Sequence, residues 1–127
     1  ARAIRPPKWP KLAIRSNKVL QHHWSKRQLL CTNAILVNCT PIGMRGNSMD
    51  QMPISILDLE KLNKSAIVYD VIYNPTKTLL LQNAEKLGLK TVNGLDMLIY
   101  QGAKALEIWT DKKPDTQTMK IAALDAL

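Results

Sequence analysis

Three short stretches of the sequence combine polar, small and conformationally special residues, and each directly follows a segment expected to form a β-strand. They are residues 38–44, 70–78 and 93–101. In an open α/β sheet, ligands bind in the crevice beyond the carboxyl ends of the strands. The three stretches are therefore candidates for one ligand site. The alternative is that each is a turn that only connects two elements, because the same residue types dominate ordinary turns.

The histidines and cysteines form no recognised metal-binding or nucleophilic pattern. His22 and His23 are adjacent, so on a helix their side chains would point about 100° apart and could not share one ion. Adding Cys31 or Cys39 gives no spacing typical of zinc sites, and the sequence therefore predicts no metal site. Cys39 has no general base near it in the sequence, so we do not expect it to act as a nucleophile.

Basic residues are concentrated at the start of the chain. The first 49 residues hold nine Lys and Arg and no acid, and the whole chain carries a net charge of +8. Such an excess favours contact with an anion, which could be a nucleic acid, a membrane surface or a phosphorylated cofactor. Trp9 and Trp24 lie among these charges, and aromatic side chains in basic patches can stack on bases. No recognised nucleic-acid motif accompanies them, so a nucleic-acid-binding module at residues 1–49 is an alternative and not the main hypothesis.

The composition indicates one globular domain. The chain has 127 residues, of which 46% are hydrophobic, and this suits an ordinary core. No apolar run approaches the ~18–20 residues needed to span a bilayer, and no secretory signal is recognisable. Two cysteines are too few for a disulfide framework. The sequence therefore predicts a cytoplasmic protein without membrane contact.

Strand-like and helix-like segments alternate along the chain. Short apolar runs predict strands at residues 12–14, 34–37, 66–69 and 89–92. Helical spacing of apolar residues predicts helices over residues 79–87, 95–109 and 116–127, with a weaker pattern over 18–30. Gly88 stands where a helix C-cap glycine belongs. This alternation predicts an α/β fold with an open, mostly parallel sheet and helices on both faces.

The three polar stretches also resemble the motifs of one family. Residues 38–44 (N-C-T-P-I-G-M) are similar to N-T-T-P-x-G-M, and residues 70–78 (D-V-I-Y-N-P-T-K-T) to D-x-x-Y-x-P-x-x-T. Residues 93–101 (N-G-L-D-M-L-I-Y-Q) are similar to N-G-x-x-M-L-x-x-Q. These motifs occur in this order in the shikimate dehydrogenase family, which includes quinate/shikimate dehydrogenases. The resemblance runs from about residue 34 to residue 127.

The resemblance implies a two-domain oxidoreductase that transfers hydride between NADP(H) and 3-dehydroshikimate or shikimate, in chorismate and aromatic amino-acid biosynthesis. Residues 1–110 would be part of a Rossmann-like NADP-binding domain, without its first strand and Gly-rich phosphate-binding turn. Residues 111–127 would form a C-terminal helix that packs back on the substrate domain. The N-terminal substrate domain would be missing from the sequence, or would be supplied by a partner chain.

By position, Tyr73 and Gln101 match the family's substrate-binding residues. A phenol hydroxyl and a primary amide can fix a polyhydroxylated carboxylic acid by direct hydrogen bonds. The resemblance therefore implies that these two side chains bind shikimate or 3-dehydroshikimate.

Four further positions match the part of the family's site that holds the nicotinamide end of the cofactor. Val71 and Gly94 match backbone positions beside the nicotinamide, and Met97 lies on the same wall. Thr40 matches a residue near the ribose on that side. We expect the missing side chain at Gly94 to let a flat ring approach the main chain closely.

Arg15, Ser16, Asn17 and Lys18 stand in and beside the places where the family often has N-R-T in the loop that binds the adenosine phosphate. No acidic residue is available there to bind the ribose 2′-hydroxyl, as NAD-specific proteins require. Arg15 and Lys18 could instead meet a 2′-phosphate, which favours NADP as the cofactor. The alternative is that both are solvated surface charges.

Two other interpretations remain beside the dehydrogenase hypothesis. One is a non-catalytic relic domain that acts through protein contacts, and the other is the basic nucleic-acid module. Titration with NADPH, with and without shikimate, separates the first hypothesis from these two. Nucleic-acid binding would instead show an affinity that falls steeply with salt.

We expect the 127-residue chain to be inactive by itself. In the family, a Lys/Asp pair from the N-terminal substrate domain handles the alcohol proton, and no lysine of this sequence matches the catalytic one. Alcohol oxidation needs such a proton acceptor as well as a positioned nicotinamide. A coupled assay of shikimate oxidation with NADP should show no NADPH formed above the buffer control, and measurable turnover would refute the expectation.

Overall fold

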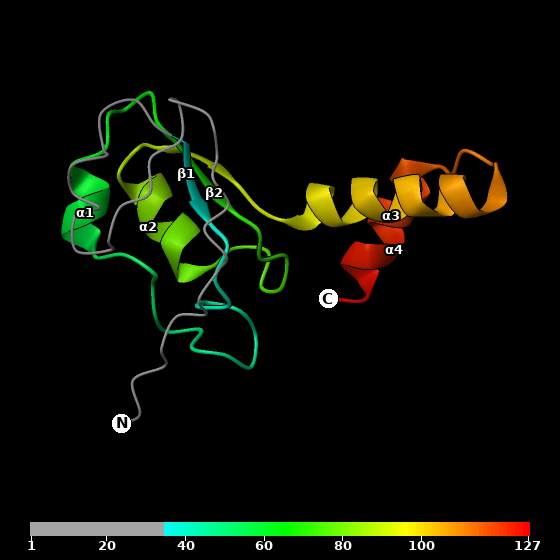
Figure 1. Ribbon diagram of the computed structural model, residues 1–127. Coiled ribbons are helices and arrows are strands. Elements are labelled where there is room, and N and C mark those ends of the chain that lie inside the picture. The colour runs from blue at the N-terminus through cyan, green and yellow to red at the C-terminus, as the bar shows by residue number, and fades with distance from the viewer. Residues whose placement is uncertain (1–34) are drawn as a thin grey trace, which may run out of the picture.

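The computed structural model describes residues 35–127, which form a sheet unit followed by a helical hairpin (Figure 1). The elements are β1 (Ile35–Asn38), α1 (Ile56–Glu60), β2 (Ile67–Asp70), α2 (Leu79–Lys86), β3 (Lys90–Val92), α3 (Leu95–Thr110) and α4 (Thr116–Asp125). The strand predicted at 12–14 and the helix predicted over 18–30 lie outside the described residues.

The three strands form a parallel sheet in the order β1-β2-β3, which confirms the sequence prediction of an α/β fold with a parallel sheet. Asn38 at the end of β1 is the register partner of Asp70 at the end of β2. Val68 of β2 pairs in the same way with Thr91 of β3. The carboxyl ends of β1 and β2 therefore lie side by side, and the loops that follow them start from the same edge of the sheet.

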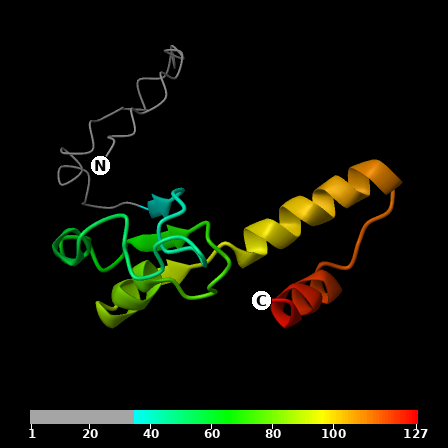
Figure 2. The same ribbon diagram turned by 90° about the horizontal axis from the view of Figure 1, so that it is seen from below.

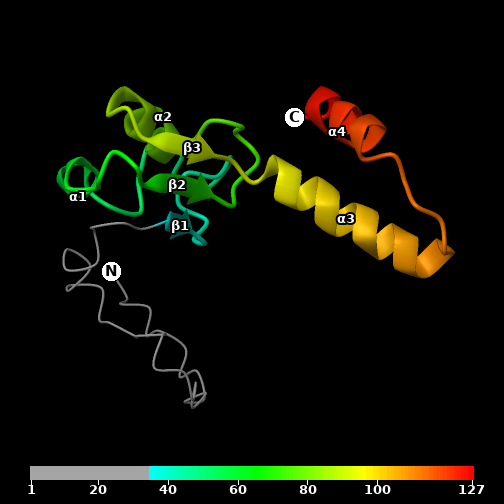
Figure 3. The ribbon, with the colours of Figure 1, turned by 90° about the horizontal axis from the view of Figure 1, so that it is seen from above.

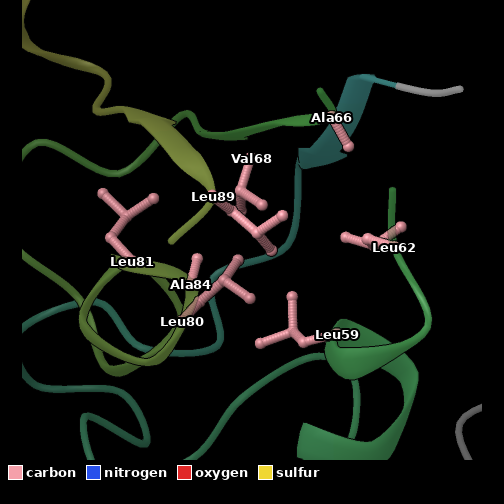
Figure 4. Close-up of a cluster of buried hydrophobic side chains, with 8 residues drawn as sticks. All are labelled: Leu59, Leu62, Ala66, Val68, Leu80, Leu81, Ala84 and Leu89. Carbon is pink, nitrogen blue, oxygen red and sulfur yellow. The ribbon is translucent and has the colours of Figure 1, made fainter. Parts of the chain in front are cut away.

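The hydrophobic core lies between one face of the sheet and the helices α1 and α2 (Figure 4). Val68 of β2 is fully buried and belongs to one cluster with Leu59 of α1 and Leu80 of α2 (Figure 4). On the opposite face, Ile35 and Val37 of β1 are exposed. Within residues 35–127, the helices packed on the sheet therefore cover only one of the two faces expected from the sequence.

Helix α2 has caps at both ends that fix its length. Thr78 is the N-cap, and its hydroxyl accepts a hydrogen bond from the backbone N–H of Leu81. Gly88 follows the helix with a φ of +74°, and the N–H groups of Gly88 and Leu89 donate to the carbonyls of Glu85 and Ala84. This is the Schellman arrangement, in which a left-handed residue satisfies the last carbonyls of a helix. The predicted C-cap role of Gly88 is confirmed.

The short helix α1 was not expected from the sequence. It has five residues and begins after the N-cap Ser55, whose hydroxyl accepts from the N–H of Asp58 at 3.2 Å. A helix of little more than one turn shows too few residues for a 3.6-residue period to be recognised. Its local signs are the capping Ser55 and Asp58 three residues later, and both residue types are also common in turns.

Helices α3 and α4 form an antiparallel hairpin that projects away from the sheet (Figures 2 and 3). Gly102 of α3 lies close to Met119 of α4, and Lys120 Nζ is 2.5 Å from Asp96 Oδ1. Tyr100 and Trp109 remain largely exposed on α3. No helix in the described part of the chain has both the length and the apolar character needed to cross a bilayer.

Candidate functional site

The Asp70 carboxylate connects the loops that follow β1 and β2. It is completely buried at the end of β2. Its Oδ1 accepts from the side-chain amide of Asn38 at 3.0 Å and from the backbone N–H of Ile72 at 3.1 Å. Its Oδ2 accepts from the Thr78 hydroxyl at 2.7 Å. One carboxylate therefore holds the end of β1, the start of the next loop and the N-cap of α2.

The same network continues to Thr40 on the other side of Asn38. The side-chain oxygen Oδ1 of Asn38 accepts from the Thr40 hydroxyl at 2.7 Å and from the Thr40 N–H at 2.9 Å. These bonds turn the chain sharply after β1. Backbone contacts then join the two loops, because the N–H of Arg45 donates to the carbonyl of Asn74 at 2.9 Å.

A pocket of about 500 Å³ opens between these two loops, at the carboxyl ends of β1 and β2. Its lining contains three of the residues that the sequence assigned to a ligand site, Thr40, Val71 and Tyr73. The other lining residues are Cys39, Pro41, Met44, Arg45, Ile72 and Asn74. Arg45 is the single charged residue in this set, so the pocket pairs a largely apolar wall with one cation. Such a site suits a flat ligand that carries an anionic group.

Gly94 packs directly against the backbone at the edge of this pocket. Its N–H donates to the carbonyl of Ile72 at 3.0 Å, and a Cβ built on Gly94 would lie 1.9 Å from the carbonyl oxygen of Val71. The chain's own backbone therefore requires a glycine here, and the approach of a flat ring to this residue stays a prediction. The space that a side chain would need is taken by the chain's own Val71 carbonyl.

Met97 and Gln101 extend the predicted site along α3. Both are exposed, and their spacing of four residues places them on the same side of the helix. Neither lines the pocket beside Tyr73. The structure thus groups Thr40, Val71 and Tyr73, places Gly94 in contact with Val71, and leaves the roles of Met97 and Gln101 as predictions. Arg15, Ser16, Asn17 and Lys18 lie outside the described residues.

An ion pair secures the far end of the loop that carries Tyr73. Lys77 Nζ is 2.8 Å from Glu85 Oε2 of α2, and the Thr91 hydroxyl donates to the other oxygen of the same carboxylate at 3.0 Å. The hydrogen bond from Lys77, followed by that from Thr91, lowers the pKa of Glu85. Glu85 is therefore ionised at neutral pH and keeps both partners.

Sequence reasoning missed Asn38 and Asp70 as organisers of the site, and Arg45 as part of its lining. The first two are polar residues at inward-facing strand positions, two residues after Leu36 and Val68. A buried polar residue at such a position needs hydrogen-bond partners. Their polar character at these two positions was therefore the signal in the sequence that they organise the site. Arg45 directly follows the motif at residues 38–44, so the motif boundary excluded it.

Comparison with known proteins places these features in one family. The family model described as the shikimate 5'-dehydrogenase C-terminal domain matches residues 94–124. A shikimate dehydrogenase (NADP(+)) of Methanococcus aeolicus is 50% identical over 93 residues, which cover 73% of this chain and 32% of that protein. The corresponding protein of Dehalococcoides mccartyi is 47% identical over 100 residues, covering 79% of this chain and 34% of that protein.

Solved structures agree with these matches. A crystal structure of a shikimate dehydrogenase in complex with NADP+ superposes with a TM-score of 0.67 at 48% identity, covering 74% of this chain and 31% of that one. The chain belongs to the shikimate dehydrogenase family. The family's shikimate 5-dehydrogenase from Listeria monocytogenes, in complex with shikimate and NAD, gives a TM-score of 0.62 at 42% identity and covers 70% of this chain and 30% of that one. The chain spans about a third of the length of these shikimate dehydrogenases.

Replacing Asp70 by Asn should destabilise the sheet unit. The substitution puts an amide where a carboxylate oxygen now accepts a hydrogen bond, so one buried donor loses its acceptor, at a cost of about 1–3 kcal/mol. Urea unfolding followed by circular dichroism measures the change in free energy. Asp50→Asn, at an exposed position, is the matched control. Equal stability of the two variants would contradict the structural role of Asp70.

Replacing Gly94 by Ala should also be unfavourable, because the new Cβ meets the Val71 carbonyl oxygen at 1.9 Å. We expect a loss of stability of about 1–3 kcal/mol, typical of overpacking. Gly102→Ala is the control within the same helix, since a Cβ there meets Met119 at an ordinary 3.6 Å. Alanine favours helices, so the control should be neutral or slightly stabilised in thermal unfolding. A Gly94→Ala variant as stable as this control would exclude the close contact.

Proposed function

We propose that this chain provides the cofactor-binding part of an NADP-dependent shikimate dehydrogenase. The reaction is hydride transfer between NADP(H) and 3-dehydroshikimate or shikimate, as expected in the biosynthesis of chorismate and aromatic amino acids. The observation that carries the proposal is the pocket in which Thr40, Val71 and Tyr73 meet at the carboxyl ends of two parallel strands. The relatives named as NADP-dependent shikimate dehydrogenases, at up to 50% identity, support it.

The residues of the pocket fit the nicotinamide end of such a cofactor. Val71, Pro41 and Met44 offer apolar contacts to a flat ring. In this proposal Thr40 would contact the ribose beside the ring, and Met97 would extend the wall along α3. Bound NADP supplies or accepts the hydride, and the residues of this chain hold and orient it. Arg15, Ser16, Asn17 and Lys18 would bind the adenosine phosphate.

Tyr73 and Gln101 are the proposed substrate ligands. Tyr73 lines the pocket and is 41% exposed, so a ligand in the pocket can reach this residue. The Gln101 amide can donate and accept a hydrogen bond, which suits a ring carrying several hydroxyl groups. Both groups position the substrate and transfer no proton.

The proton acceptor belongs, in this proposal, to a substrate domain that contacts the α3–α4 hairpin. Exposed apolar side chains on the hairpin support such a contact, with Ile108 and Trp109 of α3 at 70% and 80% exposure and Ile121 of α4 at 52%. Apolar surface of this extent usually marks an interaction site. We place the cofactor-binding part at residues 1–110 and the domain-packing helix at 111–127, in a cytoplasmic enzyme.

Titration of the chain with NADPH, followed by shikimate, tests the proposal. We expect NADPH to bind, and shikimate to bind more tightly to the NADPH complex than to the chain alone. Tyr73→Phe removes one hydroxyl and should weaken shikimate binding about tenfold, near 1.4 kcal/mol, with NADPH affinity unchanged. Tyr69→Phe, on β2, is the control. Absence of NADPH binding to the folded parent chain would overturn the proposal.

A further inference from the structure

Helix α3 is connected to the sheet unit by three residues, Asn93, Gly94 and Leu95, which we call the joint. Beyond these residues it packs against α4, and most of the hairpin lies away from the sheet (Figure 3). The direction of α3, and with it the placement of Gln101, therefore depends on how these three residues are held at its base. At the other end of the hairpin one hydrogen bond returns to the loop after β1, from the Arg45 guanidinium to the carbonyl of Leu127 at 3.2 Å.

The Asn93 side chain uses both ends of its amide in this joint. Its Nδ2 donates to the carbonyl of Thr76 at 2.9 Å, and its Oδ1 accepts from the N–H of Leu95 at 3.2 Å. The adjacent N–H of Gly94 donates to the carbonyl of Ile72 at 3.0 Å. The start of α3 is thus tied to the Tyr73 loop at two points, one on each side of Tyr73.

The acceptor on the loop is itself held in place. Thr76 precedes Lys77, whose ammonium group is paired with Glu85 of α2 at 2.8 Å. Asn93 therefore binds to a loop that is anchored to the core helix α2, and not to a free loop. The chain of contacts runs from α2 through Lys77, Thr76 and Asn93 to the first turn of α3.

We propose that Asn93 is a positioning residue, which sets the angle of α3 and thereby the separation of Gln101 from Tyr73. The effect of Asn93 on shikimate binding rests on the proposed function, whereas its effect on the angle of α3 does not. Gln101 lies seven residues beyond Gly94, or roughly 10 Å along the helix axis at 1.5 Å per residue. A tilt of about 10° at the joint would move it by about 2 Å. Displacements of about 1 Å at reacting or binding groups can cost on the order of 100-fold in rate.

Two substitutions separate the effect of the hydrogen bond to Thr76 from that of the hydrogen bond from Leu95. Asn93→Ala removes both hydrogen bonds. Asn93→Ser keeps a short oxygen acceptor for the N–H of Leu95 but has no amide that can reach Thr76. If the hydrogen bond to Thr76 fixes the angle, both variants lose that angle, although only the alanine variant loses the hydrogen bond from Leu95. Asn47→Ser, at an exposed asparagine, is the control.

The angle is measured on the full chain by electron paramagnetic resonance between spin labels at Gln82 on α2 and Lys112 beyond α3. Both positions are exposed, and all variants carry Cys31→Ser and Cys39→Ser so that only the labels react. We expect one narrow distance distribution in the parent and in Asn47→Ser, and a broadened or shifted one in both Asn93 variants. Unchanged distributions in folded Asn93 variants would overturn the inference.

Shikimate affinity in the presence of NADPH is the second measurement on the same proteins. We expect it to fall about tenfold in both Asn93 variants and to stay unchanged in Asn47→Ser. If the parent binds neither ligand, the proposed function fails, and the distance distributions still decide the role of Asn93. If the parent binds both ligands and the Asn93 variants bind shikimate as tightly, the positioning role is wrong while the proposed function stands.

Discussion

The site depends on the hydrogen bonds made by one buried carboxylate. Asp70 has no exposed surface, and removing a charged group from water is costly unless hydrogen bonds replace its solvation. Three donors from three different segments supply that replacement, from Asn38, Ile72 and Thr78. The Asp70 carboxylate therefore fixes the positions of the loops around the pocket, because it needs all three donors. These hydrogen bonds determine the shape of the pocket.

The two halves of the described structure are stabilised by different means. The sheet unit has an apolar core around Val68 and Leu80, with helices closing one face. The α3–α4 hairpin buries few side chains, and Trp109 at its far end is 80% exposed. The hairpin is connected to the sheet unit at its base and by the hydrogen bond from Arg45 to the carbonyl of Leu127. A substrate site shared between Tyr73 and Gln101 would therefore depend on a rigid base more than on the hairpin's own packing.

Much of this architecture could be predicted from the sequence, because the responsible signals are local. Apolar runs revealed the strands of residues 35–127, and Gly88 marked the end of α2 through its left-handed backbone. The partners of Asp70 could not be predicted in this way, because Asn38 is 32 positions away and becomes a neighbour only through strand register. The backbone contact that requires a glycine at position 94 could not be predicted either, since only coordinates show the Val71 carbonyl beside it. The proposed nicotinamide contacts remain predictions for the same reason, because they depend on a ligand and on residues outside 35–127.

The pairing of Asn38 with Asp70 also bears on how the sheet assembles. In a β-strand, successive side chains alternate between faces, so a slip of one residue exchanges the inward and outward sets. Sliding β1 by one position against β2 would turn an aliphatic side chain, Ile35 or Val37, toward the core and leave the Asp70 carboxylate opposite an apolar neighbour. The correct alignment alone gives that carboxylate its amide donor. The hydrogen bond between these two polar side chains therefore favours the correct register of β1 against β2. Aliphatic side chains alone would allow several registers.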